Sequence, residues 1–302
     1  EHVLNEHALN VGSRIMKMRA FCLGLIMLLL PAPGLWLDAQ AGFRSLEALA
    51  APSSDPWPRW ETSDESNGTE IDFSAWDGIL QRYLKASPEG INLFSYNAVS
   101  APDRILLDQL VAKWAALPIS TYNRAQQMAF WINLYNALTV KVILDHGPVA
   151  SIQDIDISPG FFSSGPWGKK LLRIEGVALG LNDIEHRILR PLWRDNRVHY
   201  ALNCASIGCP NLDAKAFRAG DMDSRLDAAA RAFINHPRGV RLEGGEIIVS
   251  SIYDWFTADF GGDEAGVLAH FRQYAGPALK ATLDKHGRLD RAAYDWRLNG
   301  KF

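Results

Sequence analysis

Two cysteines and a histidine occur together in the stretch HYALNCASIGCPNL, residues 199–212. Their types and spacing permit three kinds of site: a disulfide, a nucleophilic thiol or part of a metal site. Gly208 gives the loop the freedom to bring Cys204 and Cys209 within bridging distance. A thiol at a strand end that leads into a turn is suited to nucleophilic catalysis. His199 and the two cysteines offer only three ligands at uneven spacing, so a metal site is the least favoured of the three.

The N-terminal residues carry a targeting pattern. Residues 1–15 precede the first methionine and are interpreted as an upstream or non-native segment. Residues 16–41 contain basic residues, an apolar run and the small-residue site Ala39-Gln40-Ala41, which together predict a secretory signal peptide. The apolar run is broken by prolines, so no transmembrane anchor is expected after signal removal; a retained anchor is the alternative. We therefore expect a periplasmic or secreted protein.

The predicted export affects the cysteine question. Cys22 lies inside the signal peptide and would be removed with it, which leaves Cys204 and Cys209 as an isolated pair. An isolated pair in an oxidising compartment favours a disulfide. The reactive-thiol reading stays open beside it.

Composition and charge exclude several classes of protein. The chain has 302 residues, of which 48% are hydrophobic and 22% are charged, with a formal net charge of −3. This is an ordinary globular composition. No basic run or stripe is present, so nucleic-acid binding is not expected. No phosphate-binding glycine-rich loop and no HExxH motif occur, so nucleotide chemistry and zincin-type metal chemistry have no support, and no cofactor is expected.

The chain divides into a polar segment and a periodic one. Residues 42–70 are rich in Ser, Asp, Glu, Pro and Gly and predict a disordered tether. Residues 71–302 predict a single globular domain. Strands are expected at residues 197–203 and 246–252. Because helices outnumber strands without regular alternation, we expect an α+β fold, helix-rich with a small, mainly antiparallel sheet. The expected helices span residues 73–86, 102–117, 120–147, 181–194, 223–236 and 265–275.

The expected long helix contains two asparagines that need an explanation. It is capped by Ser120 or Thr121 and is apolar on nearly all sides, so it should be buried. Asn133 and Asn136 lie in its middle on one side, and buried amides need hydrogen-bond partners. They either bond to neighbouring backbone, which is the favoured reading, or face a polar site as oxyanion donors or orienting groups.

The stretch LNDIEHRIL supplies two more candidates. Asn182 followed by Glu185 matches a capping box, which would give Glu185 a structural role. His186 shares a helix face with Arg190 and is a candidate acid or base, although an ordinary helical histidine is the alternative.

The expected strand at residues 197–203 bears on the choice of base. Side chains alternate along a strand, so His199 and Cys204 would point to opposite faces unless the chain turns between them. His186 is then an equally suitable partner for the thiol, because catalytic groups are assembled in space rather than along the sequence.

Several motifs in order resemble the domain-of-unknown-function 547 family, here as a bacterial, exported member. The resemblance covers most of residues 71–302 and rests on AFWINLYNALTV, LNDIEHRILR, HYALNCASIGCPNL, YDWFTADF and YDWRLN. It implies an activity not yet established and kinship with papain- or transglutaminase-like thiol folds. In those folds the nucleophilic cysteine begins the central helix, whereas the long helix here has none. The recurrent polar residues of the family fall at Asn133, Asn136, Glu185, His186, Arg190, His199, Cys204, Cys209 and Asp259.

Asp259 enters the candidate set through this resemblance. Its carboxylate could orient a histidine; the alternative is a charge at a helix end.

Two functions follow as hypotheses. In the first, an exported cysteine-dependent hydrolase or transferase acts on an amide or peptide: Cys204 attacks, His186 or His199 is the base, and Asn133 or Asn136 stabilises the oxyanion. In the second, a non-catalytic envelope protein has a structural disulfide between the two cysteines. An aromatic surface then binds a peptide, glycan or protein partner, and its residues are Phe161, Phe162 and Trp167.

Overall fold

The computed structural model of this protein describes residues 43–159 and 165–302. The expected upstream segment and signal peptide, and the two phenylalanines of the expected aromatic surface, lie outside these residues. Within the described part of the chain, no helix combines the length and the apolar character needed to cross a membrane.

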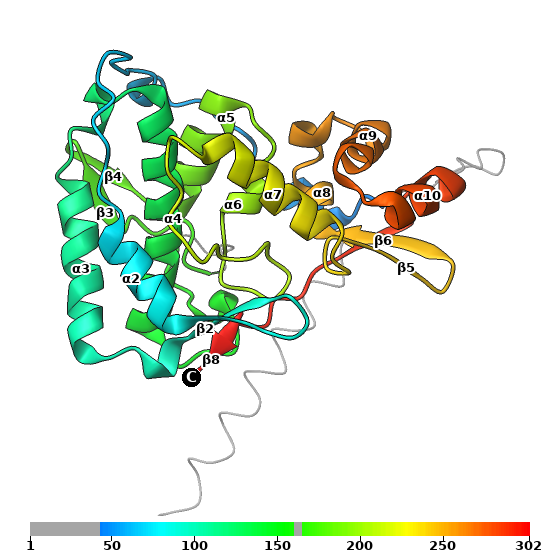
Figure 1. Ribbon diagram of the computed structural model, residues 1–302, viewed down its shortest axis with the longest axis horizontal. Helices are drawn as coiled ribbons and strands as arrows, with labels where there is room; N and C mark the ends of the chain where they lie inside the picture. The colour runs from blue at the N-terminus through cyan, green and yellow to red at the C-terminus, as the bar shows by residue number, and fades with distance from the viewer. Residues whose placement is uncertain (1–42, 160–164) are drawn as a thin grey trace, which may run out of the picture. The chain divides into compact units, whose positions relative to one another are not determined.

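Helices dominate the described residues, and the expected α+β class is confirmed (Figure 1). The helices are α2 (Ser74–Tyr83), α3 (Ala101–Ala115), α4 (Arg124–His146), α5 (Arg190–Trp193), α6 (Val198–Ala201), α7 (Met222–Ile234), α8 (Ser251–Trp255), α9 (Glu264–Tyr274) and α10 (Pro277–His286). A π-helix, η6, spans Asp183–Leu189. The 3-10 turns are η1 (Leu46–Ala50), η2 (Pro58–Trp60), η3 (Tyr96–Ala98), η4 (Ile119–Thr121), η5 (Ile152–Asp154) and η7 (Thr257–Phe260).

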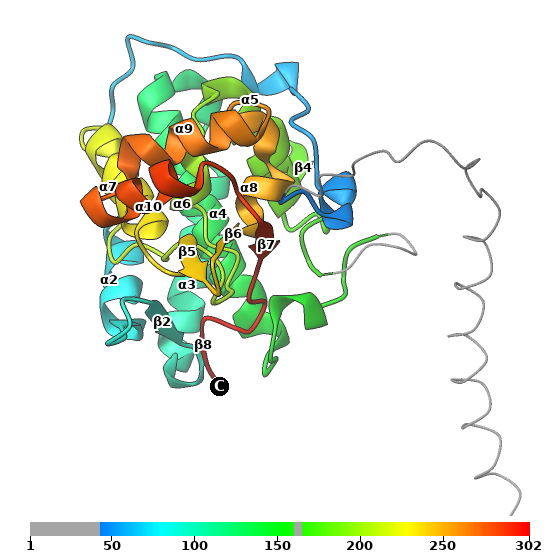
Figure 2. The same ribbon diagram turned by 90° about the vertical axis from the view of Figure 1, so that its right-hand side faces the viewer.

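The strands form three small sheets instead of one. They are β1 (Leu84–Ala86), β2 (Asn92–Ser95), β3 (Leu172–Ile174), β4 (Val177–Leu179), β5 (Val240–Glu243), β6 (Glu246–Ser250), β7 (Arg291–Ala293) and β8 (Gly300–Lys301). Antiparallel pairs join β1 to β2, β3 to β4 and β5 to β6. Parallel pairs join β2 to β8 and β6 to β7, so the last segment of the chain completes two sheets (Figure 2).

The interior divides into two hydrophobic cores. In the first, α4 is buried along almost its whole length and packs beside α3, which in turn packs on α2 (Figure 1). The second core lies among α7, α8, α9 and the sheet of β5, β6 and β7, and includes Tyr200, Phe233, Tyr253, Phe260 and Phe271. Because α6 contributes side chains to both cores, it sits where they meet.

Two predicted elements differ from the structure, one in its type and one in where it begins. The residues 197–203 expected as a strand contain the helical turn α6 instead. The physical reason is tertiary: the side chain of Asn136 bonds to the backbone at both ends of the turn that follows α6. Helix α4 begins later than expected, because Asn123 is its N-cap and accepts a hydrogen bond from the Gln126 amide at 2.9 Å.

The disordered tether expected at residues 42–70 also differs from the structure. Phe43 is buried in the second core, and Trp60 is buried in the first. The amide and hydroxyl of Ser45 both donate to the carboxylate of Asp254. Although the composition of this segment is polar, a few of its residues pack on the helical domain or hydrogen-bond to it.

Candidate functional site

A cavity of about 630 Å³ lies where the two cores meet. Its lining includes most of the candidate residues: Glu185, His186, His199, Cys204 and Cys209. These residues come from η6, α6 and the loop after α6, so a short stretch of the chain supplies the polar wall. A strand at residues 197–203 would have separated His199 from Cys204, whereas the helical turn α6 lets both line one cavity.

Cys204 lies at the start of a strained turn. Ala205, the next residue, is fully buried and has a positive φ of 59°, a conformation that residues with a Cβ rarely adopt. The side-chain oxygen of Asn203 accepts from the Ala205 amide at 3.0 Å, and the Asn299 amide donates to the Ala205 carbonyl at 3.0 Å. Strain of this kind persists where its surroundings enforce it, and functional sites are common among such places.

The last segment of the chain runs beside this turn. The amides of Ile207 and Gly208 donate to the carbonyls of Arg297 and Asp295 at 2.7 and 2.8 Å. This pairing brings the Tyr294 hydroxyl to 3.0 Å from Cys204 Sγ.

Cys204 and Cys209 are free thiols whose sulfur atoms lie 2.9 Å apart. Cys204 Sγ also lies 3.2 Å from the Ser206 hydroxyl, and the Tyr294 hydroxyl completes its shell. The hydrogen bond from Cys209 lowers the pKa of the Cys204 thiol, burial opposes this, and Ser206 and Tyr294 lower the pKa further. Burial raises the pKa of Cys209 well above its usual value, and the hydrogen bond and charge of Cys204 add to this. The two thiols are therefore unequal, and Cys204 ionises first.

Glu185 has a different surrounding from the one that a capping box would give it. Asn182 is itself helical and its side chain makes no capping hydrogen bond, because the chain continues into η6 as a π-helix. The Glu185 carboxylate lies 3.8 Å from His199 Nδ1 and 3.9 Å from His186 Nδ1. Burial raises the pKa of Tyr135 well above its usual value, and the charge of Glu185 with its hydrogen bond to the phenol adds to the effect.

His199 is held by an acidic group and an aromatic ring. Its Nε2 lies 2.7 Å from the Asp259 carboxylate, and its ring stacks on Phe256 at 4.6 Å between centroids. Arg190 Nε donates to the same carboxylate oxygen at 2.6 Å. Burial opposes ionisation of Asp259, but the hydrogen bonds from His199 and Arg190 hold the pKa of its carboxyl well below the usual range. With Nε2 bound to Asp259, the Nδ1 atom of His199 is the nitrogen that faces Glu185.

His186 is in a different state. Its Nδ1 lies 3.0 Å from Arg190 Nη1, and because a guanidinium only donates, Nδ1 accepts this hydrogen bond. Burial lowers the pKa of His186 to about 4, and the charge of Arg190 contributes in the same direction against the charge of Glu185. His186 is therefore a neutral imidazole at pH 7 with its acceptor nitrogen occupied.

The two asparagines of α4 do not line the cavity. The Asn133 amide donates to the carbonyls of Ala129 and Phe217, and its oxygen accepts from the Phe217 amide at 2.9 Å. Asn136 donates to Ala201 O and accepts from the backbone amide that follows Leu202, both at 2.9 Å. Their amide groups bond to backbone, as in the first of the two alternatives considered above, and an oxyanion role for either stays a prediction without support from this geometry.

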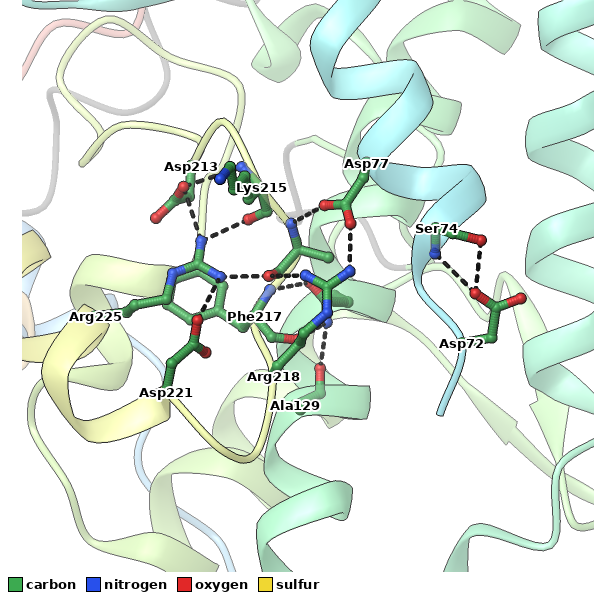
Figure 3. A network of polar contacts seen from close by, with 12 residues as sticks. Asp72, Ser74, Asp77, Ala129, Asp213, Lys215, Phe217, Arg218, Asp221 and Arg225 are labelled. Atoms are coloured by element: carbon green, nitrogen blue, oxygen red, sulfur yellow. Dashed lines mark hydrogen bonds and ion pairs between the residues drawn. The ribbon is translucent and has the colours of Figure 1, made fainter. Parts of the chain in front are cut away.

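The loop that Asn133 holds has further anchors, shown in Figure 3. Asp77 of α2 accepts from the Ala216 amide at 2.6 Å and pairs with Arg218. Arg225 of α7 pairs with Asp213 at 2.8 Å and donates to backbone carbonyls of the same loop. These contacts attach the loop to α2, α4 and α7, so this cluster stabilises the fold around the site.

Sequence reasoning missed three groups that the structure brings to the cavity: Tyr135, Tyr294 and the aromatic pair Trp255 and Trp296. All of them lie within the long motifs singled out above, but aromatic residues in buried motifs look the same whether they fill a core or line a cavity. Trp167 of the expected aromatic surface also lines this cavity.

No cluster of three or more His, Cys, Asp or Glu side chains suited to holding a metal ion occurs in residues 43–159 and 165–302. Within these ranges, the cysteine and histidine set considered as a metal site is not arranged as one.

The part of the chain between residues 119 and 234 matches the model of a family described as "Protein of unknown function, DUF547". In comparisons with curated proteins and with solved structures, nothing matches this chain. The family resemblance is confirmed over these residues, and a relation to papain- or transglutaminase-like folds stays a prediction.

Proposed function

We propose that this chain, whose residues 119–234 match the model of the DUF547 family, is a thiol-dependent enzyme that cleaves or transfers an amide-type acyl group. The observation that carries the proposal is the joint lining of one cavity by Cys204, Glu185 and His199. The lowered pKa of the Cys204 thiol supports it as the nucleophile, since the thiolate is the reactive form.

The choice of acid and base follows from the hydrogen bonds of the two histidines. His186 accepts from Arg190 and resists protonation, so it is poorly placed to take a proton. His199 is fixed through Nε2 by Asp259, and its Nδ1 side lies toward Glu185. An imidazole oriented by a carboxylate is the usual partner of a catalytic thiol. The proposal therefore assigns the proton transfers to His199.

The reaction proceeds in two halves. Cys204 Sγ gives its proton to His199 and attacks the carbonyl carbon, forming a C–S bond. The C–N bond breaks, and the leaving amine takes the proton from His199, which yields a thioester. Water, or a second amine in a transfer reaction, then gives a proton to His199 and attacks the thioester, and the Cys204 sulfur leaves with that proton.

The test compares Cys204→Ala with Cys209→Ala in turnover of a library of peptide and amide substrates. We expect Cys204→Ala to abolish turnover and Cys209→Ala to retain a measurable part of it, because Cys209 only supports the nucleophile. Turnover that persists in purified Cys204→Ala would end the proposal.

A second candidate function is favoured by the distance between the two cysteine sulfurs. The Cys204 and Cys209 sulfurs are 2.9 Å apart, so a two-electron oxidant could join them and leave a non-catalytic protein with a structural disulfide. Intact mass of the protein isolated without reductant separates the two states, because a disulfide removes the mass of two hydrogen atoms. A bridged protein that gains no activity on reduction would favour this second function.

The proposal also places the protein outside the cytoplasm, in the periplasm or secreted. Its support is the signal-peptide pattern of residues 16–41. N-terminal sequencing of the protein from the extracytoplasmic fraction tests it, with a mature chain that begins after Ala41 as the expected result.

A further inference from the structure

Four aromatic side chains form one wall of the cavity, which we call the aromatic wall: Trp167, Trp255, Tyr294 and Trp296. The rings of Trp255 and Trp296 stack at 5.6 Å, and Tyr294 lies 4.9 and 4.7 Å from them. Trp167 meets Trp296 edge to face at 5.7 Å. All four side chains are half-buried, so each keeps a surface that faces the cavity. A large aromatic surface left open in a cavity is a binding surface.

The wall reaches the proposed nucleophile directly. The Tyr294 hydroxyl is 3.0 Å from Cys204 Sγ, while its ring contacts both tryptophans of the stacked pair. A group held on Trp255 and Trp296 therefore lies next to the thiol.

The charged side chains that line the cavity are acidic. Its described lining includes the carboxylates of Glu47 and Glu185 and no lysine or arginine. Glu47 belongs to η1, which packs against α8, the helix that ends at Trp255. Two guanidinium groups bond to lining residues from behind: Arg190 contacts His186, Asp259 and the Pro52 carbonyl, and Arg238 donates to the Cys209 carbonyl at 2.8 Å.

We infer that the aromatic wall binds the ammonium group of a cationic, amine-bearing substrate, such as the lysine side chain of a peptide. Trp and Tyr faces attract a cation through their ring quadrupole, and Glu47 and Glu185 add charge complementarity. The cationic group is thereby held beside Cys204. The inference rests on the proposed function for the reaction that follows, but the binding step itself does not require the nucleophile.

Binding is measured by calorimetry on the full chain carrying Cys204→Ala, so that no probe is consumed. The probes are N-acetyl-lysine methylamide, its neutral side-chain-acetylated form, and the disaccharide chitobiose. We expect the lysine probe to bind about tenfold more tightly than its neutral form, which is the scale of a partly desolvated cation–π contact. Glu47→Gln and Trp255→Ala should each weaken the lysine probe several-fold. Glu70→Gln, the same change at an exposed carboxylate that does not line the cavity, should leave binding unchanged.

Three results overturn the inference: equal affinity for the charged and neutral probes, no measurable binding of the lysine probe, or tighter binding of chitobiose. The last would identify the wall as a sugar-stacking surface. Selective binding of the lysine probe without turnover by the unmodified protein would sustain the inference while the proposed enzyme fails. Turnover of amides with equal binding of charged and neutral probes would support the proposed enzyme and overturn the binding inference.

Discussion

Cys204 and Cys209 are the same residue type five positions apart, yet their surroundings give them opposite acid–base behaviour. Cys204 accepts hydrogen bonds that stabilise its thiolate, whereas Cys209 is buried against the Leu202 carbonyl and the Cys204 sulfur. One thiol thus serves as a donor to the other. A hydrogen bond from a thiol is weak on its own, so the hydroxyl groups that share the Cys204 sulfur matter as well.

Tyr294→Phe tests this arrangement, because it removes one hydroxyl from the Cys204 sulfur and keeps the aromatic ring. The lost hydrogen bond should raise the pKa of the Cys204 thiol by about one unit, since hydrogen bonds to charged groups contribute on the order of 1.5 kcal/mol or more. The measurement is the midpoint of the pH–rate profile for iodoacetamide alkylation, with the labelled cysteine identified by peptide mass.

Tyr274→Phe is the matched control, because its hydroxyl bonds to Asp227 at 3.1 Å and not to either thiol. Its profile should coincide with that of the unmodified protein. An unchanged midpoint in Tyr294→Phe would mean that the phenol does not stabilise the thiolate.

At the scale of elements, two side chains of α4 bind the backbone of two separate loops. Asn133 binds the backbone of the loop before α7, and Asn136 binds the backbone at the end of α6. The two residues have the same side chain, the same helix and near-complete burial, but only Asn136 holds the turn that leads into Cys204.

This difference makes Asn133→Ala and Asn136→Ala a matched pair. Both leave buried backbone groups unpaired, so each should lower the free energy of unfolding by roughly 2–4 kcal/mol in urea denaturation. Only Asn136→Ala should also slow alkylation of Cys204 in the folded protein, because the turn loses its anchor. Equal effects of the two variants on alkylation would contradict a positioning role for Asn136.

The sequence predicts most of the long elements and few of the short ones; among the long helices it misses α10. Periodicity over ten or more residues identifies α2, α3, α4, α7 and α9, because burial of one face or of the whole helix leaves a repeated signal. The four residues of α6 carry no such signal, and their alternation resembles a strand. Their conformation is imposed by Asn136, which lies more than sixty positions earlier. The π-helical form of η6, which sets the surroundings of Glu185, also depends on packing rather than on local preference.

The candidate site was also predictable only in part. The residue types of the polar wall could be chosen from the sequence, because cysteine, histidine and acidic residues recur in its motifs. Their roles could not, because Asp259 meets His199 only through the packing of η7 against α6. The N-terminal residues 43–70 are the clearest failure of composition as a guide, since a few anchors outweigh many polar residues.

At the scale of the whole described chain, two buried histidines have lowered pKa values, one at the cavity and one in the second core. His186 lies beside Arg190 at the cavity, and His270 lies in the second core, 2.7 Å from the Tyr200 hydroxyl. Burial lowers the pKa of each to about 4. Protonation of either imidazole is therefore disfavoured in the folded protein.

These two groups contribute to the pH dependence of stability, together with His236, whose pKa is also lowered by its partial burial. A histidine whose pKa is about 4 when folded and 6.5 when unfolded takes up its proton more readily in the unfolded chain. Stability is therefore complete above pH 6.5 and is lost progressively as the pH falls toward 4. Each group can contribute at most roughly 3 kcal/mol, because one pKa unit corresponds to about 1.4 kcal/mol. The carboxyl of Asp72, whose pKa is lowered from 3.8 to about 2, adds stability that is lost mainly below pH 4, as the pH falls from the first value toward the second.

Urea denaturation at pH 7.5, 6.5, 5.5 and 4.5 measures this dependence, and His270→Gln isolates one of its sources. Glutamine keeps a hydrogen-bonding group near Tyr200 but cannot take up a proton, so the variant should be less stable at pH 7.5 and lose less stability on acidification. The free energy of unfolding of the variant should approach that of the unmodified protein near pH 4.5, because the native histidine loses the most stability there. Parallel curves over the whole range would place the acid sensitivity elsewhere, with His186 as the group to replace next.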